Sequence, residues 1–222
     1  MKQYRTIRFS LDKGIARLVL DQPPSNRMSM ELFGELDDLL PRIERSKTIQ
    51  ALVIYGNGRH FSSGTDLSSL LGEIEKNSPD TEIPEFLFRN YRTLGILGAL
   101  PFPVIASIRG VCLGSAMELA LSSHFRFCSS ETIFGLPEST FNLMPGLGGI
   151  QKVAALAGKA RTMQLVIKGD TFGAADALKF NLVDKILPKN GLIEESIRFA
   201  KSIDTRYRKE KHKLYLSKFF DH

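Results

Sequence analysis

The sequence contains no tryptophan and only two cysteines among its 222 residues. Cys112 and Cys128 each stand in an apolar stretch, which is typical of reduced thiols packed as small hydrophobic residues. So few cysteines exclude a disulfide-rich secreted scaffold and favour a reducing, cytoplasmic setting. A packed thiol is also favoured over a nucleophilic role for Cys112. No stretch approaches about 18 uninterrupted apolar residues, so we expect neither a membrane span nor a signal peptide.

Histidine is also scarce, and its four copies are scattered at His60, His124, His212 and His222. No cluster of histidine and cysteine has metal-ligand spacing, so we expect no bound metal. The chain also lacks a P-loop and the G-x-S-x-G elbow of serine hydrolases. Gly110 and Gly114 do not complete a G-x-G-x-x-G fingerprint, which disfavours an NAD site.

The composition is otherwise that of a globular protein, with 43% hydrophobic and 24% charged residues. A chain of this size buries roughly 70% of its surface, so we expect one domain with a self-sufficient core. The net charge is +6, and the last 22 residues hold seven basic against three acidic side chains. This basic end fits a phosphate-bearing ligand, a nucleic acid or an acidic protein, and equally a solvated helix face.

Hydrophobic periodicity predicts alternating strands and helices. Two short apolar runs, Ile15–Leu20 and 51–55, are each closed by a turn signal. Between them, apolar residues recur at spacings of three and four from Ser29 onward, which indicates an amphipathic helix. This unit of strand, helix and strand predicts parallel strands that are covered on both faces.

A second unit of the same kind follows. It comprises a strand at 103–108, a tight glycine turn at 109–114, a helix at 115–121 and a strand at 125–128. Downstream, helices are predicted at 148–157, 160–168, 173–180 and from about 192, with an extended piece at 182–186. The candidate flexible stretch is 73–84, where polar and charged residues crowd together.

Two glycine-containing turns have the character of oxygen-binding loops. Residues 61–67 (FSSGTDL) follow a buried strand and leave backbone amides uncovered, which suits a carbonyl or phosphate oxygen. The alternative for this segment is a plain strand-to-helix connection capped by Asp66. The turn at 110–114 leads directly into a helix, so the positive end of the helix dipole faces whatever lies in front of it.

Two glutamates stand in apolar, glycine-rich surroundings. Glu118 lies among Met, Leu and Ala, and carboxylates are seldom buried unless they are paired or used. Glu138 follows Pro137, which stiffens its position within the apolar segment 134–149. The alternatives are an exposed helix face for Glu118 and a surface or capping role for Glu138. As a pair they favour acid and base chemistry, because burial raises a carboxyl pKa toward working pH.

These segments resemble those of the enoyl-CoA hydratase/isomerase, or crotonase, family. Residues 61–67 are similar to the first oxyanion segment of that family, 110–120 to the second, and 134–149 to the loop with the second acid. Order and spacing agree from about residue 5 to about residue 205. The resemblance implies an α/β fold with a crotonase-like (ββα)n spiral core and a shortened C-terminal helical region. We expect the core at 1–190 and the shortened, basic helical segment at 191–222.

The resemblance also implies a site. It puts a thioester carbonyl oxygen between the backbone amides of Thr65 and Ser115, and it makes Glu118 and Glu138 the catalytic carboxyls. Ser115 stands where many relatives have glycine. Further substrate contacts are expected at Ser63, Gly64, Asp66, Leu67, Gly114, Pro137 and Gly146.

The function that the resemblance implies is that of a lyase in fatty acid metabolism, adding water reversibly and syn to a 2-enoyl-CoA to give a 3-hydroxyacyl-CoA. Coenzyme A is then part of the substrate, and no tightly bound cofactor is expected. A double-bond isomerase or decarboxylase on the same scaffold is the alternative, and the thioester carrier is coenzyme A or an acyl carrier protein. A binding role of the basic tail toward nucleic acid is disfavoured, because the tail has few interleaved aromatic residues.

Family members form trimers and dimers of trimers, so the resemblance implies a homotrimer or hexamer. The family's C-terminal helices are curtailed in this sequence, while apolar residues persist near its end at Leu214, Leu216, Phe219 and Phe220. Burial of a phenylalanine contributes about 1.5 to 3 kcal/mol, so Phe219 and Phe220 are expected to hold the tail against its own domain or a neighbour.

Overall fold

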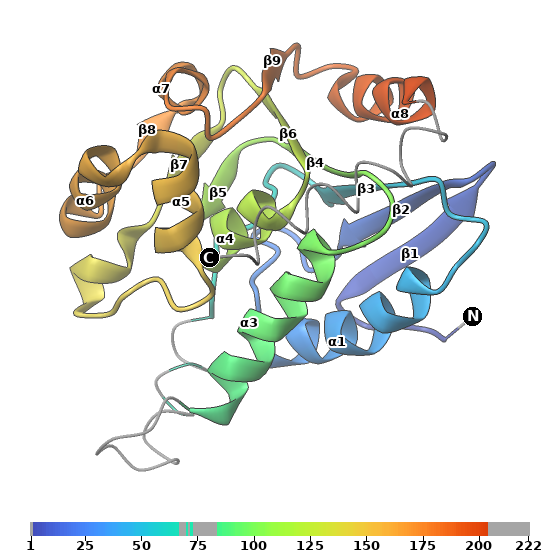
Figure 1. Cartoon of the computed structure of the whole chain (residues 1–222), viewed down its shortest axis with the longest axis horizontal. Coiled ribbons are helices and arrows are strands. Elements are labelled where there is room, and N and C mark those ends of the chain that lie inside the picture. The colour runs from blue at the N-terminus through green and yellow to red at the C-terminus, as the bar shows by residue number, and fades with distance from the viewer. Residues whose placement is uncertain (1, 67–69, 71, 73–83, 204–222) are drawn as a thin grey trace.

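A six-stranded sheet runs through the middle of the molecule in the order β1-β2-β3-β4-β6-β9 (Figure 1). The computed structural model describes residues 2–66, 70, 72 and 84–203. The six strands are β1 (Ile7–Asp12), β2 (Ile15–Leu20), β3 (Ala51–Gly56), β4 (Val104–Ile108), β6 (Phe125–Ser129) and β9 (Lys185–Leu187). Within this sheet, as the structure describes it, only the β1–β2 pair is antiparallel, which confirms the parallel arrangement expected for the core strands.

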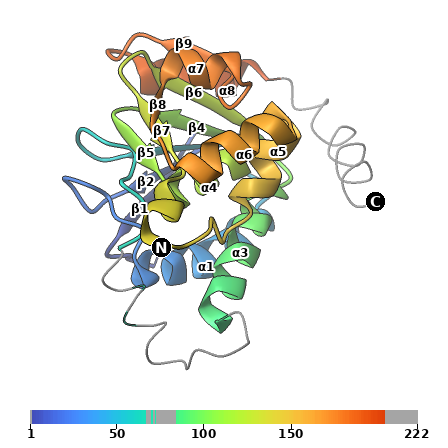
Figure 2. The ribbon, with the colours of Figure 1, turned by 90° about the vertical axis from the view of Figure 1, so that its left-hand side faces the viewer.

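Helices cover both faces of this sheet. The helices of the described residues are α1 (Met30–Glu44), α3 (Glu85–Gly98), α4 (Ser115–Ser122), α5 (Gly149–Ala157), α6 (Lys159–Lys168), α7 (Ala174–Lys179) and α8 (Leu192–Ser202), with the 3-10 helix η1 (Pro137–Phe141). Figure 2 shows α8 on one side of the sheet and α1 and α3 on the other. Within the described ranges, no helix combines the length and the apolar character needed to cross a membrane.

Alternation along β3 shows how one short apolar run serves both faces. Leu52 and Ile54 pack into the large core on the side of α1 and α3, whereas Ala51 and Val53 join a smaller cluster with residues of α8. All four side chains are fully buried. The continuous apolar runs therefore correctly predicted a sheet that is covered on both faces.

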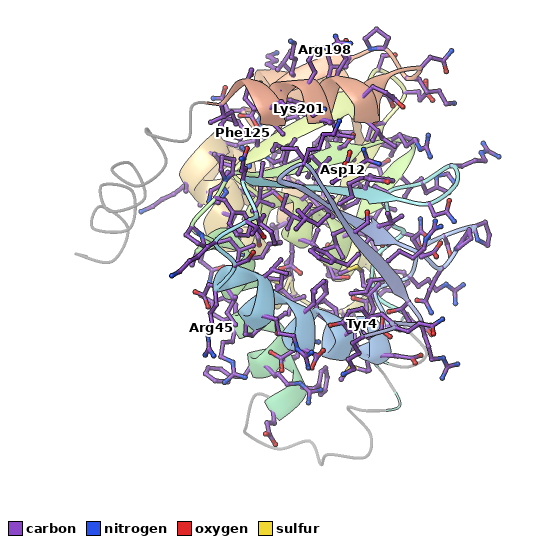
Figure 3. All side chains as sticks on the ribbon, turned by 90° about the vertical axis from the view of Figure 1, so that its right-hand side faces the viewer. Tyr4, Asp12, Arg45, Phe125, Arg198 and Lys201 are labelled. Carbon is purple, nitrogen blue, oxygen red and sulfur yellow. The ribbon has the colours of Figure 1, made fainter. Side chains whose placement is uncertain are left out.

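Helix α8 closes the second face with aromatic contacts. The ring of Phe199 meets those of Phe125 and Phe127 edge-on, each at a centroid distance of 4.9 Å. Figure 3 shows Phe125 next to α8, on the side of the sheet away from α1. The described part of the segment 191–222 thus packs on the sheet. The domain boundary stays a prediction, and 204–222 lies outside the described residues.

The sequence correctly predicted where the first helix begins. Ser29 caps α1, and its Oγ accepts a hydrogen bond from the amide of Leu32 at 3.2 Å. The predicted helices downstream are confirmed as α5, α6, α7 and α8, each within a few residues of its expected start. Only the end of the predicted extended piece 182–186 belongs to β9. The candidate flexible stretch lies outside the described residues apart from Pro84.

The glycine turn predicted at 109–114 is wrong in part, because it contains the short strand β5 (Val111–Leu113). β5 joins β7 (Ile133–Gly135) and β8 (Phe172–Gly173) in a second, three-stranded sheet. Three residues are too few to show a period, and the strand forms because its partners align with it. Two strands followed by a helix recur as β1-β2-α1 and β4-β5-α4, which matches the expected (ββα)n order.

The N-terminal strand β1 was not predicted, and a carboxylate of α1 ties the backbone just before it. Glu35 Oε1 accepts from the amide of Arg5 at 2.6 Å, and Oε2 accepts from the amides of Thr6 at 2.9 Å and Ile7 at 3.2 Å. Burial alone raises the pKa of Glu35, but these hydrogen bonds outweigh it and hold the pKa below its ordinary value. Nearby, Tyr4 lies beside α1 (Figure 3). Its hydroxyl donates to Asp38 of that helix at 2.7 Å.

We expect Glu35→Gln to lower the free energy of unfolding by about 1 to 2 kcal/mol at neutral pH, because amides lose a charged acceptor. Since the folded pKa is lowered, this stabilisation is present above the unfolded pKa and disappears as pH falls through the folded value. Denaturant unfolding at pH 7 and at pH 3 measures both effects. Glu44→Gln, at an exposed position on the same helix, is the control. An equal loss at both pH values would contradict this account.

Candidate active site

One pocket of about 100 Å³ collects most of the residues predicted for the site. Its walls come from α1, α3 and α4, from Thr65, Asp66 and Leu70, and from the segment 138–147. Most of the lining is apolar, and its polar members are Thr65, Asp66, Asn90, Ser115, Glu118 and Glu138. The pocket thus has the composition of a small-molecule site, with an apolar wall and a few polar groups.

The structure brings together six of the eleven predicted residues in the lining of this pocket. They are Thr65, Asp66, Ser115, Glu118, Glu138 and Gly146. Ser63, Gly64, Gly114 and Pro137 are neighbours of these in the chain but do not line the pocket, and Leu67 lies outside the described residues. Three separate segments of the chain thus meet at one pocket, while the roles assigned to their residues stay predictions.

The first two segments meet because residues 61–65 run beside β5. The Ser62 amide donates to the Val111 carbonyl at 3.1 Å, and the Leu113 amide donates to the Ser62 carbonyl at 3.3 Å. Gly64 has φ +89°, and a Cβ there would lie 2.5 Å from the Leu113 carbonyl oxygen. Only glycine allows this approach. The close pairing places Thr65 Oγ1 2.8 Å from Ser115 Oγ, to which it donates.

Two backbone amides are available at this junction. Ser115 begins α4, and the first amides of a helix have no acceptor within it. Among the described residues, neither the Thr65 amide nor the Ser115 amide donates to a protein group. Both belong to residues that line the pocket. This junction can therefore bind one oxygen, with the positive end of the α4 dipole behind it.

Glu118 is buried, as its apolar neighbours predicted: all eight residues of α4 are buried, and Glu118 is 1% exposed. Its Oε1 accepts from the amides of Leu147 and Gly149, each at 2.8 Å. Burial raises the pKa of Glu118, and these two hydrogen bonds oppose the rise. A Cβ on Gly149 would come within 2.9 Å of the Glu118 side chain, so glycine leaves room for the carboxyl.

Lys152 of α5 is a functional neighbour that the sequence analysis missed. Its Nζ donates to the Leu147 carbonyl at 3.0 Å, and its charge lowers the pKa of Glu118. Burial lowers the pKa of Lys152 itself, while Glu118 raises it. Lys152 thus holds the segment that binds Glu118 and adds a positive charge close to it. The one sequence signal for this proximity to Glu118 was the position of Lys152, four residues and thus one helical turn after Gly148.

Glu138 sits in η1 and is the less constrained of the two carboxyls. Burial, with a smaller contribution from the charge of Glu118, raises the pKa of Glu138 to about 7. Its Oε2 is buried without a hydrogen-bond partner. Gly114 has φ +53°, and a Cβ there would lie 3.0 Å from Glu138 Oε1, so this glycine gives the carboxyl its space. Pro137 begins η1 and fixes the backbone beside it.

These groups define what the pocket can do chemically. Two amide donors can stabilise negative charge on an oxygen, and two carboxyls whose pKa values are raised by burial can act as acid and base. Asp66 is held by an ion pair with Arg27 at 3.5 Å, at the edge of the pocket. Within the part of the chain that the structure describes, no three His, Cys, Asp or Glu side chains are grouped as metal ligands.

The apolar wall was also absent from the predicted site. It includes Met28, Phe33, Phe86, Leu87, Leu143, Met144 and Leu147. No signal in the sequence separates such residues from core residues, because both follow the same apolar periodicity. Asn90 of α3 was missed as well.

Comparisons with known proteins point to the same family as the sequence motifs. The family model described as enoyl-CoA hydratase/isomerase matches residues 10–215. The chain is 34% identical over 195 residues to the fatty acid oxidation complex subunit alpha of Shewanella loihica, covering 86% of this chain and 27% of that one. It therefore spans less than a third of that relative's length. It is 29% identical over 177 residues to the Bacillus subtilis protein named "Probable enoyl-CoA hydratase", covering 80% and 67%.

A solved structure extends the comparison to the fold. The crystal structure of enoyl-CoA hydratase from Bacillus anthracis superposes with a TM-score of 0.82 at 28% identity, covering 89% of this chain and 76% of that one. This likeness confirms the crotonase-like fold that the sequence motifs implied. The family match covers most of the residues from β1 to α8 and every segment of the pocket. The chain belongs to the enoyl-CoA hydratase/isomerase family.

Proposed function

We propose that the protein adds water reversibly to a 2-enoyl-CoA and gives the 3-hydroxyacyl-CoA. The observation that carries this proposal is the convergence of Glu118 and Glu138 with the uncommitted amides of Thr65 and Ser115 on one largely apolar pocket. Hydration needs each of these parts: a site that stabilises negative charge on the carbonyl oxygen, a base that accepts a proton from water, and an acid that protonates the α-carbon. The family match and the names of the relatives support the same reaction class.

The amide pair supplies the main catalytic effect. The thioester carbonyl oxygen accepts hydrogen bonds from the Thr65 and Ser115 amides, and attack at the β-carbon moves electron density onto that oxygen. The α4 dipole adds to the stabilisation of the resulting enolate. In other enzymes, removal of one such donor costs about 3 kcal/mol of transition-state stabilisation.

The two carboxyls carry the protons. Water forms its bond to the β-carbon while one of its protons passes to Glu118, and the enolate then receives a proton at the α-carbon from Glu138. The pKa of about 7 keeps a fraction of Glu138 protonated at neutral pH, as a donor requires. Dehydration follows the same steps in reverse, and proton exchange between the pair restores the starting state.

A double-bond isomerase is the second candidate, and one contrast within the pair favours it. Glu118 Oε1 is held by two amides, whereas Glu138 Oε2 has no partner and its carboxyl titrates near neutral pH. A single free carboxyl is enough to carry a proton between two carbons above the same oxyanion site. The carrier of the thioester, the trimeric or hexameric assembly and the cytoplasmic location stay predictions.

The two candidates are separated by their effect on conjugated absorbance. With crotonyl-CoA, hydration removes the enoyl absorbance, and mass spectrometry detects a product heavier by one water. An unchanged crotonyl-CoA signal, combined with a gain of absorbance from a 3-enoyl-CoA, would contradict hydration and support isomerisation.

Glu118→Gln and Glu138→Gln are each expected to lower kcat at least about 100-fold, because acid and base catalysis contributes about 10² to 10⁴. Glutamine at 118 keeps an oxygen for the Leu147 and Gly149 amides, so the fold should persist. Crotonyl-CoA turnover and circular dichroism measure the two effects, and Glu194→Gln at an exposed position of α8 is the matched control. Near-normal turnover in either variant removes that residue from the mechanism.

Thr65→Ala and Ser115→Gly should each reduce kcat/KM less than about tenfold, because the donors to the carbonyl belong to the backbone. The side chains contribute the hydroxyl contact of 2.8 Å between them. Steady-state kinetics on the same substrate tests this expectation. A loss as large as that of the glutamate variants would mean that a hydroxyl, rather than an amide, acts on the substrate.

Lys152→Gln should shift the acidic limb of the kcat/KM profile to higher pH. The lysine charge lowers the pKa of Glu118, so its removal raises that pKa and delays formation of the carboxylate base. Lys152→Arg keeps the charge and serves as the control. An acidic limb that stays in place in Lys152→Gln would show that Glu118 does not govern it.

A further inference from the structure

Asn90 of α3 is a buried polar side chain that the fold leaves unsatisfied. It is 4% exposed and lines the pocket. Its Oδ1 is buried without a hydrogen-bond partner, and no hydrogen bond joins its carboxamide to any described residue. A buried amide without partners costs free energy, and a leucine of similar size would avoid that cost.

The surroundings of Asn90 sharpen this contrast. One turn earlier on α3, Phe86 and Leu87 line the same pocket, and Phe33 of α1 contributes to the wall as well. One turn later, Thr93 is fully buried, and its hydroxyl lies 3.0 Å from Asp37 Oδ1 and 2.9 Å from the Arg89 carbonyl. The fold therefore satisfies the neighbouring buried polar group on α3 but leaves the Oδ1 of Asn90, in a largely apolar pocket lining, without a partner.

A carboxamide in this place is suited to a ligand. It offers both donor and acceptor atoms, and its terminal torsion is soft, so either atom can turn toward the pocket. Thr65, Ser115, Glu118 and Glu138 already have roles in the proposed function, at the carbonyl oxygen and at the protons of water, and Asp66 is ion-paired with Arg27. In pockets of this type, single polar groups on an apolar wall select the ligand.

We propose that Asn90 is a specificity-determining residue that hydrogen-bonds a hydroxyl or oxo group on the acyl chain of the substrate. The protein then prefers oxygenated acyl thioesters to plain alkyl thioesters of the same size. This inference rests on the proposed function in one respect, that the acyl group occupies this pocket. A buried amide left unpaired by an alkyl chain discriminates against it.

Binding of saturated acyl-CoA pairs tests the inference without turnover. Each pair consists of an ω-hydroxyacyl-CoA and the acyl-CoA in which methyl replaces the hydroxyl, in a series from butanoyl to octanoyl. Titration calorimetry measures the ratio of the two Kd values in each pair. We expect one length at which the wild type binds the hydroxy compound preferentially, and a drop of that preference by about tenfold in Asn90→Leu.

Two further variants keep the test decisive. Thr93→Val removes a buried hydroxyl from the same helix but does not line the pocket, so its Kd ratio should equal that of the wild type. Asn90→Ala adds no bulk and favours helix, so it takes the place of Asn90→Leu if that variant does not fold.

No preference at any length, or a preference that persists without Asn90, overturns the inference. This includes the case in which an ordered water molecule alone satisfies the amide. Acyl-CoA binding with the expected preference but without hydration of crotonyl-CoA or its hydroxylated analogues overturns only the proposed reaction. Failure of the wild type to bind any acyl-CoA overturns both.

Discussion

The burial of the Glu118 carboxyl is the constraint on which the rest of the site depends. A carboxyl that is 1% exposed needs partners, and the amides of Leu147 and Gly149 supply them. Those amides converge only if the segment after η1 folds back onto α4, and Lys152 fastens that segment through the Leu147 carbonyl. The same fold of this segment brings Glu138 to the pocket. The hydrogen bonds required by the buried Glu118 carboxyl are therefore linked to the position of the second carboxyl.

The second requirement is close approach of backbone to backbone. Residues 61–65 and β5 pair so tightly that Gly64 accepts no Cβ, and Gly114 leaves the space that Glu138 occupies. The pocket therefore combines polar groups held by tight backbone contacts with side chains of α1 and α3. Under the proposed function, this arrangement keeps the reacting groups fixed, while the residues of α1 and α3, Asn90 among them, set which acyl groups fit.

Much of this could be predicted from local sequence, for reasons that also mark the limit. The strand Ile15–Leu20 and the helix after Ser29 carry their own periodicity and cap, and Glu118 stands out because its neighbours are apolar. The strand β5 has only three residues and exists through its partners, so it was taken for a turn. Lys152 stands out only through its electrostatic effect on Glu118, and Asn90 only because it lines a pocket built by several separate segments, so no local pattern indicates either residue.

The central claim is that a thioester carbonyl binds where the Thr65 and Ser115 amides meet, with both glutamates beside the reacting carbons. A crystal structure with butanoyl-CoA, a saturated analogue that cannot be hydrated, tests this most directly. The account predicts a carbonyl oxygen about 2.7 to 3.1 Å from both amide nitrogens, with the α- and β-carbons facing Glu138 and Glu118. A carbonyl bound elsewhere, or an acyl chain outside this pocket, would contradict it.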